Sequence, residues 1–213
     1  MALILPEELT LIGRTPAGHE YGSSTRLAVA AGVIGELALH RRITIDRGYV
    51  FVTDPTPTTH LFLDPLLGKL IQRPSAISLT DCLRDQALLY EWWLNHLVRS
   101  GLLRPEAAGS PPGSTRYVPD PEVRDPVLTR LRYLLNGWAE QNPRTVALAG
   151  IVHGSGLGDD LIPFPADRAA LAAFGQQDPI GRAIMAIHTE DRRSADAPAG
   201  GFFVFLSSAP GGC

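Results

Sequence analysis

The sequence predicts a mainly α-helical single domain, compact and built around one central apolar helix, with small β-hairpins. Three observations predict this class. Residues 25–40 form an almost wholly apolar run with helical spacing, and a helix that is apolar on most sides packs inside a protein. A second such run occupies residues 144–153. Strict alternation of apolar and polar residues is confined to short segments, which predict hairpins rather than a large sheet.

The composition is that of a globular protein. The chain has 213 residues, of which 45% are hydrophobic and 19% charged, and its net charge is −3. A chain of this length can bury a substantial core in one domain. The net charge supplies no global attraction to nucleic acid or anionic lipid, so any such contact needs a local basic patch. With two cysteines, one of them the last residue, we expect a reducing compartment and no structural disulfide.

The sequence predicts neither a signal peptide nor a membrane span. Glu7 and Glu8 follow a very short apolar start, whereas a signal peptide needs a basic start and a longer apolar core. The longest apolar run, residues 27–39, is too short to cross a bilayer and contains Glu36. We therefore expect a cytoplasmic protein that contacts a membrane only peripherally, at its inner face.

The N-terminal elements follow from local patterns. LPEELTLIG, residues 5–13, predicts a short amphipathic helix. Residues 23–25 offer N-cap oxygens to the central helix. Gly32 and Gly35 lie inside that helix, where they lower helix propensity, so we expect them to allow close approach by another helix. Alternation over residues 43–52, interrupted by Asp-Arg-Gly, predicts a hairpin.

The middle of the chain predicts more helices and a second hairpin. Residues 61–72 contain a short helix after an Asp-Pro pair, and another helix starts at Ser78. Residues 102–104 and 116–118 predict the two strands of the hairpin. We expect one well-packed amphipathic helix over residues 87–100, and its predicted buried face comprises Leu88, Leu89, Trp92, Trp93, His96 and Leu97.

Four helices and a Gly-rich turn are predicted after the second hairpin. Residues 120–122 are predicted to cap a helix that extends to residue 142, with its regular part starting near Pro126 and Trp138 on its buried stripe. The second apolar helix, a Gly-rich turn at residues 154–160 and two closing helices then complete the domain. We assign residues 1–193 to this domain and residues 194–213 to a Gly-, Ala- and Pro-rich tail that we expect to be flexible. Its β-prone FFVFL window either docks on the domain or is an exposed aggregation-prone segment.

Sequence motifs give no positive support for an enzyme, a metal or a cofactor. The six histidines show no spacing suited to zinc. His188 is followed by Glu190 and Asp191 at a predicted helix end, where a solvated face is the simpler interpretation. His153-Gly-Ser-Gly lacks the Lys-Ser/Thr ending of a phosphate-binding loop. We therefore predict no catalytic site, no metal site and no cofactor.

The helix at residues 87–100, followed by strand, loop and strand, resembles half of a winged-helix domain. DNA binding needs several basic residues on one face. The helix instead carries Glu91 and has one arginine, Arg99, near its end, and the wing offers only Arg104 and Arg116. We predict no nucleic-acid partner, and a winged-helix regulator remains the third hypothesis.

The order of the segments resembles the Golgi phosphoprotein 3 family. The segments that carry the resemblance, spread over residues 3–190, are LPEELTLIG, GELALHRRITID, LVRSGLL before a hairpin, LGDDLIPF and GRAIMAIH. The resemblance implies a compact helical domain with one protruding hairpin. It also implies a peripheral membrane protein that binds phosphatidylinositol 4-phosphate. Eukaryotic members act as adaptors that retain glycosyltransferases in the Golgi.

When the family's lipid-binding residues are matched to this sequence by position, none of the basic ones is present. The family's tryptophan before the central helix corresponds to Tyr21, and its arginine within that helix corresponds to Ala30. Its two arginines on the later helix correspond to Ala87 and Tyr90. The hairpin differs as well, because its tip, PEAAGSPPGST, is not apolar as it is in the family.

Two arginines lie close in sequence to the lost positions. Arg26 lies one turn before Ala30, and Arg84 lies three residues before Ala87; side chains at such spacings share a helix face. We predict a displaced site for anionic phospholipid headgroups, phosphoinositides above all, formed by Tyr21, Arg26 and Arg84. The alternative is that both arginines are solvated residues at helix starts. The chain would then be a protein-interaction adaptor without lipid binding, with a protein partner or a second copy of itself.

Overall fold

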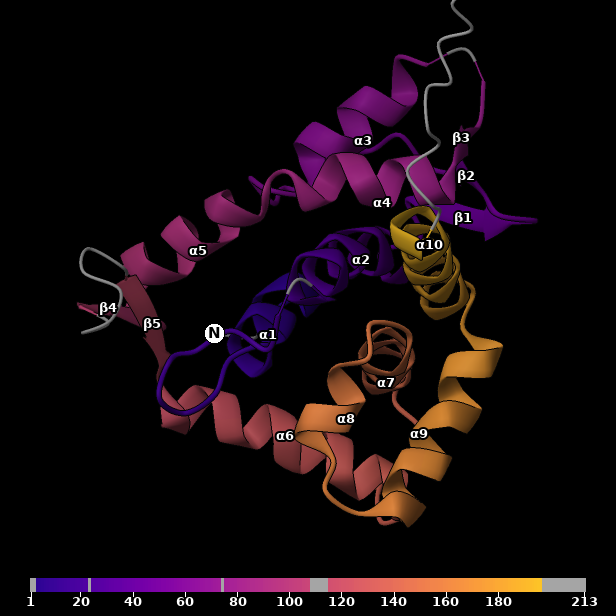
Figure 1. The fold of residues 1–213 in the computed structure, drawn as a ribbon. Coiled ribbons are helices and arrows are strands. Elements are labelled where there is room, and N and C mark those ends of the chain that lie inside the picture. The colour runs from indigo at the N-terminus through magenta and orange to yellow at the C-terminus, as the bar shows by residue number, and fades with distance from the viewer. Residues whose placement is uncertain (1–2, 23, 74, 108–114, 197–213) are drawn as a thin grey trace, which may run out of the picture.

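Helix α2 (Ser24–Leu39) lies at the centre of the molecule, with other helices on several sides (Figure 1). The computed structural model describes residues 3–22, 24–73, 75–107 and 115–196. Over these residues the fold has ten helices and two small antiparallel sheets, which confirms the predicted class. The proposed tail boundary falls within the last helix, and residues 197–213, including FFVFL, lie outside the described residues.

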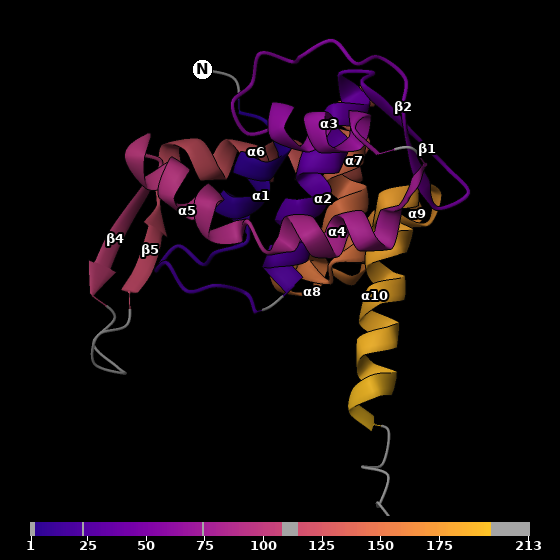
Figure 2. The ribbon, with the colours of Figure 1, turned by 90° about the horizontal axis from the view of Figure 1, so that it is seen from above.

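The other elements follow in chain order. The first half contains α1 (Leu5–Ile12), β1 (Ile43–Asp46), β2 (Tyr49–Val52), α3 (Asp64–Ile71), β3 (Ile77–Ser78), α4 (Leu79–Ala87) and α5 (Tyr90–Arg99). The second half contains β4 (Leu103–Ala107), β5 (Thr115–Pro119), α6 (Pro121–Leu135), α7 (Pro143–Gly154), α8 (Leu157–Leu161), α9 (Pro165–Gln177) and α10 (Pro179–Asp196). The β4–β5 hairpin and α10 project from different ends of the helical body (Figure 2).

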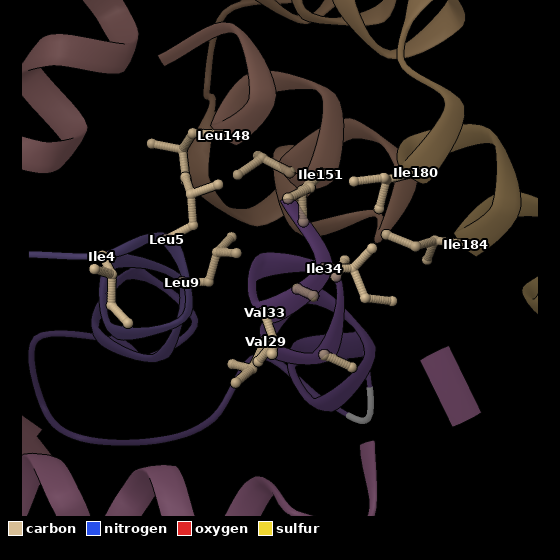
Figure 3. Close-up of a cluster of buried hydrophobic side chains, with 14 of the residues drawn as sticks. Ile4, Leu5, Leu9, Val29, Val33, Ile34, Leu148, Ile151, Ile180 and Ile184 are labelled. Atoms are coloured by element: carbon tan, nitrogen blue, oxygen red, sulfur yellow. The ribbon is translucent and has the colours of Figure 1, made fainter. Parts of the chain in front are cut away.

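The core forms where α1, α7 and α10 meet α2, as Figure 3 shows. Isoleucine, leucine and valine side chains of these four helices interdigitate there, and each is removed from water. Gly32 permits a close approach of α1 to α2, because a Cβ at this position would lie 2.8 Å from the backbone nitrogen of Pro6 in α1. A Cβ at Gly35 would lie 3.1 Å from the Cδ1 atom of Leu5, which also belongs to α1. The prediction that these two glycines admit a neighbouring helix is confirmed.

Both hairpins lie where the sequence predicts them, and the strands of the second, β4 and β5, extend into the predicted loop. Arg47 and Gly48 connect β1 to β2 with positive φ values of 47° and 82°, the conformation of a two-residue turn whose twist matches the strands. A third strand, β3, pairs with the other side of β2. It was not predicted, because two residues are too few for an alternation signal. The strands β4 and β5 pair over five residues each.

The prediction of one continuous helix over residues 87–100 is wrong. The chain turns at Leu88 and Leu89, and α5 begins at Tyr90. The side chains of Leu88, Leu89 and Trp92 are exposed, not buried. The observed buried face is rotated relative to the predicted one, because the buried stripe of α4 continues through the turn into α5. This stripe comprises Leu79, Cys82, Leu83, Gln86, Tyr90, Trp93, Leu94 and Leu97.

Three further expectations are corrected. The predicted cap is present, since the Asp120 carboxylate accepts the Glu122 N–H at 3.0 Å, but the regular helix α6 starts at Pro121 rather than near Pro126. Trp138 is 73% exposed, because α6 ends at Leu135 and the chain then turns away. The predicted Gly-rich turn contains a short helix, α8.

Candidate functional site

Tyr90 lies at the centre of the region where the sequence predicts a headgroup site. It is the first residue of α5, and its side chain is buried. Two guanidinium groups lie near its ring: the Cζ atoms of Arg14 and Arg26 are 6.0 and 5.2 Å from the ring centroid. Burial raises the pKa of the Tyr90 phenol above its ordinary value, so the group is neutral at physiological pH. The ring therefore offers a cation–π face to both arginines.

Arg14 is a structural cation. Its side chain is buried in the α1–α2 connection, and its Nη2 atom donates to Tyr90 Oη at 2.9 Å and to Glu20 Oε2 at 3.2 Å. The guanidinium also lies 5.1 Å from the ring centroid of Tyr117, on the β4–β5 hairpin. Arg14 thus joins the loop, α5 and the hairpin. Sequence reasoning missed it, because a single arginine after a helix gives no signal of its partners.

Arg26 is the accessible cation of this region. It lies in the first turn of α2, and half of its side chain is exposed. Its Nη2 atom donates to Glu91 Oε1 at 3.2 Å across to α5. The guanidinium is therefore held between the Tyr90 ring and an exposed carboxylate, and it keeps N–H groups that can reach an anion from solvent.

Arg84 is held by a different part of the fold. Its Nη2 atom lies 2.9 Å from Glu190 Oε2 and 3.7 Å from Asp191 Oδ1, so it links α4 to the far part of α10. Arg26 and Arg84 are therefore paired with carboxylates on separate helices. Tyr21, the third predicted residue, is partly buried against the core, and its backbone N–H donates to the Gly13 carbonyl at 3.0 Å.

The positions that correspond to the family's arginines are closed. Ala30 and Tyr90 are 1% exposed, and Ala87 packs against the core. The Tyr90 side chain occupies the space beside Arg14 that a pocket at these positions would need. An anion can therefore approach Arg26 from outside, but it cannot enter between α2 and α5.

Charges on the β4–β5 hairpin are balanced locally. Glu106 accepts hydrogen bonds from both Arg104 and Arg116. The hydrogen bond from Arg116, and to a smaller extent that from Arg104, holds the pKa of Glu106 below its ordinary value. Both arginines of the winged-helix hypothesis, Arg104 and Arg116, therefore form ion pairs with the same carboxylate. This pairing weakens their electrostatic attraction to DNA phosphates. Within the described residues, no group of three or more histidine, cysteine, aspartate or glutamate side chains could hold a metal ion.

The described residues form a mainly helical domain with two small antiparallel sheets. None of its described helices is long and apolar enough to cross a membrane. A model of the Golgi phosphoprotein 3 (GPP34) family matches residues 5–188. The chain belongs to this family. No curated protein matches the chain.

Proposed function

We propose that the protein binds anionic phospholipid headgroups at a membrane surface, as a peripheral protein in the cytoplasm at the inner face. The observation that carries the proposal is the half-exposed Arg26 guanidinium, held over the Tyr90 ring. An arginine fixed in this way presents parallel N–H groups to a phosphate. Membership of the Golgi phosphoprotein 3 family supports this role, and the resemblance suggests phosphatidylinositol 4-phosphate as the headgroup. We propose binding rather than catalysis.

The existing ion pairs do not prevent headgroup binding. The pairs Arg26–Glu91 and Arg84–Glu190 join side chains that are about half exposed, and such pairs contribute about 0.2–1 kcal/mol. A phosphate monoester carries more charge than a carboxylate and competes for the same N–H groups. One basic residue contributes about 1 kcal/mol near an anionic membrane. With Arg26, Arg84 and Tyr21 as the proposed contacts, on separate parts of the surface, binding should be weak and salt-sensitive.

Sedimentation with liposomes tests the proposal. One set of vesicles contains phosphatidylinositol 4-phosphate, one contains cardiolipin, and one contains only neutral lipid. Wild type is compared with Arg26→Ala/Arg84→Ala and with the control Arg104→Ala, which removes a more exposed arginine on the hairpin. We expect wild type and the control to sediment with anionic vesicles at low salt, and the double variant to remain in solution.

The two anionic sets distinguish a specific from a general site. Preference for phosphatidylinositol 4-phosphate over cardiolipin at equal vesicle charge supports a phosphoinositide site, and equal binding supports a site for anionic lipid in general. If folded wild-type protein binds none of the vesicles at low salt, the proposal is wrong.

A protein-interaction adaptor is the second candidate, and one observation favours it. A cavity of about 690 Å³ between α6 and the start of α9 is lined by Tyr133, Trp138 and Phe164, three exposed aromatic side chains. Aromatic residues of this kind are typical of protein-binding surfaces. Retention of a partner by wild type but not by Trp138→Ala/Phe164→Ala, in a chain that binds no lipid, would support the adaptor.

A further inference from the structure

Four large apolar side chains are exposed on one face of the molecule. Leu88, Leu89 and Trp92 lie at the turn between α4 and α5, with exposures of 80%, 37% and 56%, and Leu61 before α3 is 77% exposed. We call these four residues the α4–α5 ridge. The Trp92 N–H donates to the Leu89 carbonyl at 3.0 Å, and the Trp92 ring packs edge-on against Phe62, next to Leu61, with centroids 5.6 Å apart. The Phe62–Trp92 contact brings the chain at Leu61 beside the α4–α5 turn.

The ridge follows from the order of residues along α4 and α5. The buried stripe of these helices takes in two polar side chains, Gln86 and Tyr90, while leucine and tryptophan side chains beside them face outward. A globular protein normally buries the apolar residues of such a pair of helices. Their outward position indicates a contact made by this face with something outside the chain.

The ridge is also held in a fixed conformation. Phe62 lies under Trp92 and packs against Trp93 and His96, with centroid separations of 5.0 and 4.4 Å. Trp93 is buried. The outward-facing Trp92 therefore rests on an anchored aromatic cluster, so little conformational freedom is lost when it is covered.

The charges around the ridge favour a bilayer as the occupant. Arg84 lies one turn before Leu88 on the same face, and Arg26 contacts Glu91, which immediately precedes Trp92. The apolar centre is thus flanked by two arginines, and each is paired with exposed carboxylates that lipid phosphates can replace. This arrangement matches the layered chemistry of a membrane surface, where tryptophan lies at the interface and arginine reaches the headgroups. A stable protein interface needs about 800 Å² on each partner, which is more than four side chains supply.

We infer that the α4–α5 ridge inserts into the acyl boundary of a bilayer while the neighbouring arginines contact the headgroups. The inference rests on the proposed function, and it adds a second component of binding that does not depend on charge. Burial of a single leucine side chain shifts a partition equilibrium by about tenfold or more. Together the two components bind the membrane more firmly than either alone.

The two components respond differently to salt, and this difference provides the test. Vesicles of phosphatidylcholine with phosphatidylinositol 4-phosphate are titrated at low and high salt with wild type, Leu88→Ser/Leu89→Ser and Arg26→Ala/Arg84→Ala. Phe51→Ser is the control, because it removes an exposed apolar residue, 42% exposed, from strand β2. Circular dichroism and thermal unfolding establish that each variant is folded.

We expect the leucine variant to lose at least tenfold in partition coefficient at high salt, and Phe51→Ser to match wild type. We also expect brominated lipid to quench Trp92 emission, with the quenching lost in Trp92→Phe. If the leucine variant binds as wild type while the arginine variant does not, the inference is wrong and the proposed function stands. If wild type binds no vesicle, both are wrong. If the leucine variant instead abolishes a dimer in solution without changing vesicle binding, the ridge is a contact between copies, and the inference is wrong.

Discussion

Arg144 donates two hydrogen bonds to Glu36, at 2.6 and 2.7 Å, although the Glu36 side chain has no exposure to solvent. The same carboxylate accepts the Leu5 N–H at 2.9 Å. One acid in the central apolar helix thus joins α1, α2 and α7. A buried carboxylate is tolerated only when its oxygens are paired in this way.

Arg144→Met should lower the free energy of unfolding by about 3–5 kcal/mol, because it leaves the buried Glu36 with only the Leu5 N–H and the partly exposed His40 as partners. Denaturant unfolding at neutral pH measures the change. The control is Arg104→Met, which breaks a pair whose arginine is 73% exposed and should change stability by less than about 1 kcal/mol. Equal decreases in the free energy of unfolding of the two variants would show that the buried ion pair stabilises the fold no more than the exposed one.

We expect the ion pair between Arg130 and Glu8 to make the free energy of unfolding depend on pH. Burial raises the pKa of Glu8 above its ordinary value of 4.5, and the Arg130 ion pair at 2.7 Å opposes that rise. A raised pKa in the folded state means that stability falls as pH rises through that value. Arg130→Met should therefore lose more stability, relative to wild type, as pH rises from about 4 to about 8.

Unfolding free energies of the two proteins across this pH range test the prediction. Adding Glu8→Gln to Arg130→Met removes the titrating carboxyl, so the pH-dependent part of the difference should disappear. A difference that stays constant from acid to neutral pH would mean that Glu8 is not the group responsible.

Much of the fold could be predicted because its main signals are local. The run at residues 25–40 is apolar on most faces, which indicates a central position. Asp-Arg-Gly between alternating segments specifies a two-residue hairpin. The family resemblance covers nearly the whole described chain, and the family model confirms it. The tertiary partners of Glu36 and Arg14 could not be predicted, since they lie far apart in sequence.

The candidate site was harder to predict because hydrophobicity indicated the wrong face of α5. Leu88 and Trp92 are more apolar than Gln86 and Tyr90, yet the fold buries the second pair and exposes the first. Tyr90 can be buried because Arg14 provides a partner for its hydroxyl. Sequence spacing places Arg26 and Arg84 near the lost basic positions, but it does not reveal that each has a carboxylate partner on another helix.

Gly32 and Gly68 should respond in opposite directions to alanine. A Cβ at Gly32 would lie 2.8 and 2.9 Å from the backbone N and Cα atoms of Pro6, whereas nothing lies within 4 Å of one at Gly68. Gly32→Ala should lower stability by about 1–3 kcal/mol, because α1 must move away from α2. Gly68→Ala should raise it by about 0.5–1 kcal/mol through helix propensity. Thermal unfolding measures both, and stabilisation by Gly32→Ala would contradict the close approach of α1 and α2.

Tyr90→Phe separates the structural role of the hydroxyl from the binding role of the ring. The change removes the acceptor that Arg14 uses at 2.9 Å and keeps the aromatic face that lies near Arg26. The free energy of unfolding should fall by about 1–3 kcal/mol, because the buried Arg14 loses one hydrogen bond. Vesicle binding by the folded variant should equal that of wild type, since Arg26 contacts the ring and not the hydroxyl. Denaturant unfolding and vesicle titration measure the two effects. The opposite result, unchanged stability with weakened binding, would assign the hydroxyl to headgroup contact and make Arg14 part of the binding site.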